Sequence, residues 1–113
     1  MLPRQVPLAL ADIVAYLLDR STREDNFCVF GETYEDLSVA GVYYLDAYSV
    51  VDDDDKETYS EFVTQRRLEF LYSGQQFADV VDVLTREKPD AAIADYATAL
   101  NYYAEHDTFM PVA

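Results

Sequence analysis

The sequence has few of the residues on which most enzyme and metal chemistry depends. It contains one cysteine, one histidine and no tryptophan. A nucleophilic triad needs a serine or cysteine with a base and an orienting group, and a structural zinc site needs several cysteine or histidine ligands. The sequence also lacks the glycine-rich motifs that bind phosphates and the G-x-S-x-G motif that presents a catalytic serine. We therefore expect a protein that is not an enzyme and that holds no cofactor and no metal.

The single cysteine and the single histidine stand in contexts that do not suggest chemistry. Cys28 lies within the apolar run at residues 26–31, where we expect it to be a small core residue. One cysteine excludes a disulfide within the chain, which fits a reducing compartment. His106 follows the last predicted helix, where a histidine interacts favourably with the helix dipole. We find no signal-peptide pattern and no apolar run near the roughly 18 residues of a membrane span, so we expect a cytoplasmic protein.

Basic residues are scarce as well. The chain has 8 lysines and arginines against 22 aspartates and glutamates, a formal net charge of −14. Binding to nucleic acid or to an anionic membrane requires basic patches, so we expect neither as a partner. A strong negative charge instead speeds association with a positively charged protein. The competing interpretation is that the acidic surface serves solubility alone.

The acidic residues are concentrated in the middle of the chain. Residues 1–29 hold four acids and three bases, and residues 62–113 hold eight acids and four bases. Residues 30–61 hold ten acids and one base, so this part dominates the electric field of the molecule. We expect its densest point, Asp52 to Lys56, to be a loop, because four adjacent like charges repel one another in any regular element. The pentapeptide DDDDK coincides with the recognition sequence of enteropeptidase.

Glycine and proline are rare, and half of the residues are apolar, so the chain has the composition of a folded domain. Its 113 residues correspond to a single domain, 1–113. Apolar residues at helical spacing predict helices over 9–20, 74–87 and 91–105. Apolar runs rich in β-branched and aromatic residues predict strands near 27–31, 40–51 and 67–72. We therefore expect an α+β fold, with a small sheet of about three strands packed against one N-terminal and two C-terminal helices.

The run that ends at Val51 is predicted to be the central strand of this sheet, because both of its alternating sets of side chains are largely apolar. Asp46 is the exception within the run. A buried carboxylate needs a partner, so we expect Asp46 to lie near an exposed edge or to pair with Arg66 or Arg67.

Three other charged residues are assigned by their place in the pattern. Arg23 follows the first helix in a polar connection, and we expect it to be exposed. Asp82 lies off the apolar stripe of the 74–87 helix, so it should face water. Asp90 follows Lys88-Pro89 and is expected to cap the last helix.

Tyrosine is the other residue in excess, with ten copies. Exposed tyrosines among carboxylates suit a basic protein surface, because the acids pair with arginine or lysine and the rings stack on guanidinium groups. The predicted partner-binding residues all belong to the acidic middle of the chain: Glu32, Tyr34, Glu35, Asp36, Asp52, Asp53, Asp54, Asp55, Glu57, Tyr59 and Glu61. An alternative surface lies around the end of the last helix and consists of Tyr102, Glu105 and His106.

The second half of the sequence, roughly residues 58–109, has a recognisable order of motifs. A strand leads into Ser73-Gly74, then a helix with the letters V-V-D-V-L, a K-P-D link and a helix that ends in L-N-Y-Y-A-E-H-D-T-F. This order resembles the small acidic immunity proteins of bacterial polymorphic toxin systems, including those of contact-dependent growth inhibition. The resemblance implies a cytoplasmic antidote that binds one cognate toxin domain, often a nuclease, and occludes its active site. It implies no catalytic residues, since that family shares none.

Three functions are therefore open at this point. The first is an immunity protein that neutralises a toxin domain by covering a basic surface. The second is an acidic adaptor or regulatory subunit that binds another basic protein. The third is a small enzyme or a calcium-binding domain, although the run Asp52–Glu57 lacks the central glycine and the alternate spacing of a calcium loop. No sequence feature indicates an oligomeric state.

Overall fold

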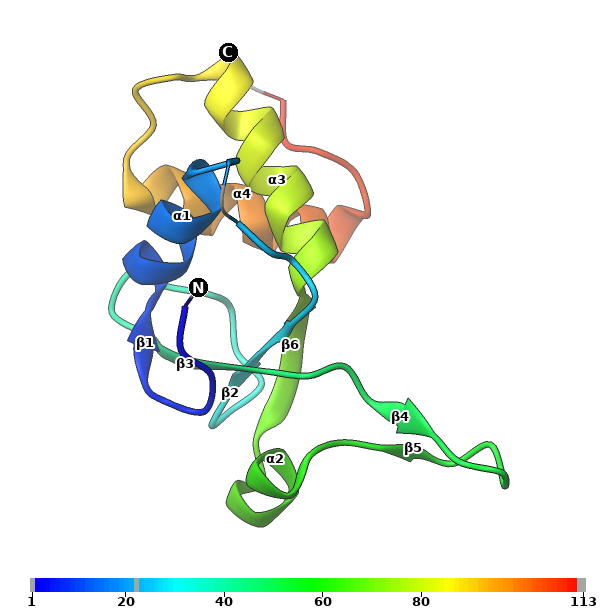
Figure 1. The fold of residues 1–113 in the computed structure, drawn as a ribbon. Helices are drawn as coiled ribbons and strands as arrows, with labels where there is room; N and C mark the ends of the chain where they lie inside the picture. The colour runs from blue at the N-terminus through cyan, green and yellow to red at the C-terminus, as the bar shows by residue number, and fades with distance from the viewer. Residues whose placement is uncertain (1, 22, 112–113) are drawn as a thin grey trace.

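The computed structural model describes residues 2–21 and 23–111 and confirms the α+β class. The helices are α1 (Leu10–Leu18), α2 (Glu61–Arg66), α3 (Gly74–Glu87) and α4 (Ile93–His106). The strands are β1 (Leu8–Ala9), β2 (Cys28–Gly31), β3 (Val42–Asp46), β4 (Val50–Val51), β5 (Glu57–Thr58) and β6 (Glu69–Ser73). Figure 1 shows α1, α3 and α4 gathered at one end of the molecule and α2 at the other, with β1, β2, β3 and β6 between them.

The main sheet has four antiparallel strands in the order β1-β3-β2-β6. In its centre, Cys28 pairs with Asp46 and Phe30 with Tyr44, and on the other side Cys28 pairs with Ser73. The remaining strands, β4 and β5, pair only with each other and form a separate two-stranded ribbon.

The larger core lies between one face of the sheet and the helices α1, α3 and α4. The sheet contributes Val29, Tyr43, Leu45 and Tyr72. The helices contribute the apolar stripes that their spacing predicted, and the hydroxyls of Thr85 and Tyr96 join α3 to α4 at 2.6 Å.

A smaller core lies on the opposite face of the sheet, under α2. Cys28, Phe30 and Val63 are buried there, and Tyr59, Phe62 and Leu68 are packed against them. The alternation along β3 therefore places Tyr43 and Leu45 in the larger core, while Tyr44 on the other face packs against Phe62 with ring centroids 5.7 Å apart. The prediction that both faces of this strand are covered is confirmed for Tyr43–Asp46.

The predicted strand over residues 40–51 is too long. The chain leaves the main sheet after Asp46, and Val50 and Val51 belong to the separate ribbon, where both side chains are exposed. The apolar pattern continues past Asp46, but Tyr48, like the two valines, is exposed. The sheet also includes β1, a two-residue strand that no alternating pattern predicted.

Asp46 is buried, and the prediction that it pairs with Arg66 or Arg67 was wrong. Its carboxylate accepts hydrogen bonds from Gln5 Nε2 (3.1 Å), Ser60 Oγ (2.5 Å) and the Ala47 amide (2.8 Å). Three donors replace the water that burial removes. Arg66 lies instead over the rings of two aromatic residues, with its guanidinium carbon 5.4 Å from the Tyr44 centroid and 4.9 Å from that of Phe62.

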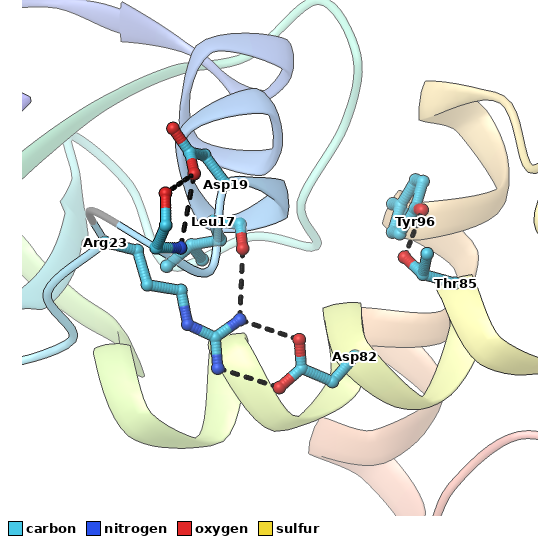
Figure 2. Close-up of polar contacts among 7 residues, drawn as sticks. Leu17, Asp19, Arg23, Asp82, Thr85 and Tyr96 are labelled. Atoms are coloured by element: carbon cyan, nitrogen blue, oxygen red, sulfur yellow. Dashed lines mark hydrogen bonds and ion pairs between the residues drawn. The ribbon is translucent and has the colours of Figure 1, made fainter.

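Three further expectations about charged residues were wrong. Arg23 is largely buried and forms an ion pair with Asp82 (Figure 2). The Asp82 carboxylate therefore faces the Arg23 guanidinium and is largely shielded from water. Asp90 does not cap the last helix, because α4 begins at Ile93 and the carboxylate of Asp95 accepts the Ala92 amide at 2.9 Å. An acid in the first turn satisfies a free amide and complements the helix dipole.

Candidate functional site

The most prominent surface feature is the ribbon of β4 and β5, which we call the acidic arm and define as residues 47–60. It projects from the body of the molecule beyond the end of β3 (Figure 1). Within it Val50 pairs with Thr58, and Val51 pairs with Glu57. The arm holds five acids, Asp52–Asp55 and Glu57, against one base, Lys56.

The tip of the arm is ordered by two of its own aspartates. The Asp52 carboxylate accepts the amides of Asp54 and Lys56, each at 2.9 Å, and the Asp52 amide donates to the Lys56 carbonyl at 3.1 Å. Asp55 has a φ of 58°, a left-handed conformation that aspartate tolerates better than most residues. Asp52 and Asp55 therefore shape the turn, whereas Asp53 and Asp54 are exposed at its apex.

The root of the arm is closed by a hydrogen bond between Ser60, its last residue, and Asp46, the residue just before its first. The Ser60 hydroxyl donates to the buried Asp46 carboxylate at 2.5 Å. Ser60 Oγ also accepts a hydrogen bond from the Val63 amide at 3.3 Å, as the N-cap of α2. Ser49 donates to Glu57 across the ribbon at 2.5 Å. The arm is thus fixed to the sheet and to α2 at its base.

Tyr59, predicted as an aromatic contact for a partner, is half-buried at this root. Its ring packs edge-on against Phe30 with centroids 5.5 Å apart and lies 6.5 Å from that of Phe70. Burial raises the pKa of the Tyr59 hydroxyl, and the nearby Glu57 carboxylate raises that pKa further. Tyr59 therefore serves the smaller core and holds the arm, since its ring is already packed.

Val50 and Val51 carry the exposed apolar surface of the arm. They are 70% and 62% exposed. Consecutive residues of a strand point to opposite faces, so each face of the ribbon presents one of these valines to solvent. Their apolar character predicted core positions for them, so they were not among the predicted partner-binding residues.

The other predicted residues lie in the segment after β2, which we call the Tyr34 loop and define as residues 32–37. Asn101 of α4 holds it: its side chain accepts the Leu37 amide and donates to the Leu37 carbonyl, both at 2.8 Å. Tyr34 is 79% exposed, and Glu35 and Asp36 are exposed beside it. The loop borders a pocket of about 240 Å³ that Leu71 also lines.

The fold separates these two groups. Phe30 pairs with Tyr44 and Cys28 with Asp46, so the Tyr34 loop follows β2 at the end of the sheet where β3 begins. The arm leaves from the end where β3 stops (Figure 1). The predicted acidic residues therefore form two surfaces. The arm and the α2 start carry Asp52–Asp55, Glu57 and Glu61, and the Tyr34 loop carries Glu32, Tyr34, Glu35 and Asp36.

The alternative surface at the end of α4 is small. The Tyr102 ring stacks on the His106 ring with centroids 4.2 Å apart, and Glu105 Oε2 lies 4.0 Å from His106 Nε2. Glu105 and His106 are exposed.

Cys28 is 1% exposed and buried in the smaller core. Burial raises the pKa of its thiol to about 11, which keeps it protonated and unreactive at neutral pH. Across residues 2–21 and 23–111, no three histidine, cysteine, aspartate or glutamate residues are grouped so as to hold a metal ion. None of the helices in the same described ranges has the length and apolar character to cross a membrane.

The described elements define a small α+β protein with a projecting acidic ribbon. The chain belongs to the family DUF7716, described as a domain of unknown function, which it matches over residues 10–112. No curated protein and no solved structure matches the chain.

Proposed function

We propose that this protein is a cytoplasmic immunity protein that binds a cognate toxin domain and neutralises it by covering a basic active-site surface. The observation that supports this most is the acidic arm, which carries five acids and one base away from the body of the protein. The order of motifs in the second half of the chain, which resembles that of small acidic immunity proteins, supports it independently.

Electrostatics gives the arm a role in the encounter. A toxin domain that acts on nucleic acid needs a basic cleft, and an acidic protein is attracted to such a cleft before the two surfaces touch. Four acids of the arm, Asp52–Asp55, lie in the turn between β4 and β5 at its projecting tip (Figure 1), where they would meet a partner first. An antidote must act quickly, and charge complementarity raises association rates more than it raises affinity.

One observation favours a second candidate, an acidic adaptor. The Tyr34 loop is a second acidic surface at the other end of β3, with an exposed aromatic residue held on an anchored segment. A protein that joins two basic partners would use two separate surfaces of this kind, whereas an inhibitor of one toxin needs only one.

The deciding experiment uses the domain encoded beside this gene. We expect that domain to be toxic when expressed alone, to be tolerated when coexpressed with this chain, and to form a 1:1 complex with it. Loss of two charges by Asp53→Asn with Asp54→Asn should slow association by about threefold to tenfold at low salt and weaken its salt dependence.

The matched control removes two exposed acids far from the arm, by Glu87→Gln with Asp90→Asn. Its association rate should stay close to that of the unaltered protein. If both double variants slowed association equally, electrostatic attraction would depend on the net charge of the protein, and the arm would have no special role in it. A neighbouring domain that is harmless, or that does not bind, would overturn the immunity function.

A further inference from the structure

We propose that the acidic arm enters a cleft of its protein partner and is covered there on both faces, with apolar walls against Val50 and Val51 and a basic floor beneath the tip. This inference rests on the proposed function and specifies how its partner is bound. The alternative geometries are a flat surface that meets one face of the arm and a partner strand that pairs with its edge.

The positions of the two valines carry the argument. Val50 and Val51 are consecutive, so their side chains lie on opposite faces of the ribbon. They are 70% and 62% exposed, the two most exposed valines among the large apolar residues at the surface of the described chain. A flat partner can cover only one of them, and only a cleft can cover both.

The charge of the arm selects the chemistry of that cleft. The exposed acids Asp53 and Asp54 lie at the apex, beyond the valines, so an entering arm brings them to the floor and the valines to the walls. Carboxylates buried at a floor require positively charged partners. A second copy of this chain is excluded as the occupant on the same ground, because it would bring another strongly negative surface, net −14, against the arm.

The arm is prepared for insertion by its internal bonds. The Asp52 carboxylate fixes the turn, and the bond from Ser60 to Asp46 fixes the root. A ribbon of only two strands has little stability of its own in water. These bonds order the arm before binding and so reduce the conformational entropy that is lost when the partner binds. No side chain of the body needs to move to expose either valine.

The test measures the dissociation constant for the toxin domain encoded beside this gene, by titration calorimetry with the full chain. The variants are Val50→Thr, Val51→Thr and the pair together, since threonine keeps the shape and strand preference of valine but places a hydroxyl against an apolar wall. The control is Val39→Thr, at a valine that is 50% exposed in the segment before β3. Far-UV circular dichroism and thermal unfolding confirm that each variant is folded.

We expect each arm variant to weaken binding by about tenfold and the pair to weaken it more than either change alone, with no change for Val39→Thr. An effect at only one of the two valines would overturn the cleft in favour of a flat surface. Tight binding that is unaffected by either change would also overturn the cleft, while the immunity function stands. Absence of binding by the unaltered protein would overturn both.

Discussion

Arg23 and Asp82 face each other with two parallel hydrogen bonds, Nη1 to Oδ1 at 2.6 Å and Nη2 to Oδ2 at 2.8 Å (Figure 2). The same Nη1 atom donates to the Leu17 carbonyl at 3.0 Å, near the end of α1. One guanidinium group therefore joins the last turn of α1 to the middle of α3. The pair lowers the pKa of the Asp82 carboxyl and raises that of Arg23, mainly through these hydrogen bonds.

The first prediction concerns this pair. Asp82→Asn should lower the free energy of unfolding by about 2 kcal/mol at pH 7, because it leaves a largely buried guanidinium without its counter-ion. Asp82 has a lower pKa in the folded than in the unfolded chain, so its contribution is complete above the unfolded value and is lost as pH falls through the folded value. Urea unfolding from pH 7 down to pH 3 should show the difference between variant and parent shrink only below about pH 4.

Glu87→Gln is the control, since Glu87 is an exposed acid on the same helix. It should change stability by less than about 0.5 kcal/mol. Equal effects of the two substitutions would mean that the ion pair adds nothing beyond the removal of one negative charge.

The second prediction concerns the root of the arm. Ser60→Ala removes both a donor to the buried Asp46 carboxylate and the N-cap of α2, and should destabilise the protein by about 2–3 kcal/mol. Ser49→Ala removes a similar hydroxyl bond on the exposed part of the arm and should lower stability by less than about 0.5 kcal/mol. Both are measured by urea unfolding. A Ser60 variant as stable as the Ser49 variant would contradict the structural role of the root.

The third prediction compares two glycines. A Cβ at Gly74 would lie 2.4 Å from the Phe27 carbonyl oxygen and 2.6 Å from that of Asp25, both backbone atoms. A Cβ at Gly31 would come too close only to a flexible side-chain atom, Leu71 Cδ1, at 2.8 Å, while the Thr33 carbonyl oxygen would lie at an ordinary contact distance of 3.5 Å. Glycine to alanine in a helix ordinarily stabilises by about 0.5–1 kcal/mol, but Gly74→Ala should destabilise by more than about 2 kcal/mol.

Gly31→Ala should destabilise by about 1 kcal/mol, because the Leu71 side chain can shift. Thermal unfolding of the two variants gives the comparison, with about 4 °C expected for each kcal/mol. The reverse order would show that the backbone before β2 adapts more readily than the Leu71 side chain.

The fourth prediction concerns the anchor of the Tyr34 loop. Asn101→Asp keeps an acceptor for the Leu37 amide but replaces the donor to the Leu37 carbonyl by a carboxylate oxygen, which should cost about 1–3 kcal/mol and loosen the loop. Hydrogen exchange of residues 32–37 should become faster. Thr98→Ala, which removes only a bond within α4 to Ala94, should leave that exchange unchanged. Unchanged exchange in Asn101→Asp would mean that other contacts hold the loop.

Much of the fold followed from local sequence patterns. The helix predicted over residues 74–87 coincides with α3, because its apolar stripe lies between Ser73, which accepts the Gln76 amide, and the Lys88-Pro89 stop. The loop predicted at Asp52–Lys56 is confirmed as the turn between β4 and β5. Each of these features is decided by residues a few positions apart in the chain.

The features that were missed depend on distant residues. The apolar residues around Val50 continue the pattern of β3, and their exposure shows only once the rest of the chain fails to cover them. Asp46 required partners, but Gln5 and Ser60 lie 41 and 14 positions away and carry no charge that would have marked them. Tyr59 was assigned to the surface by its acidic neighbours, whereas Phe30 and Phe70 draw its ring into the smaller core.

Because the core is divided into two parts, the reactivity of one cysteine can report on the smaller core alone. Cys28 is the only thiol of the chain, and it lies under α2 rather than among α1, α3 and α4. If α2 separates from the sheet while the larger core stays folded, a thiol reagent should reach Cys28. The labelling rate of Cys28, compared with the rate of global unfolding, would thus measure how tightly α2 is held at the base of the arm. A partner that binds the arm should slow that labelling.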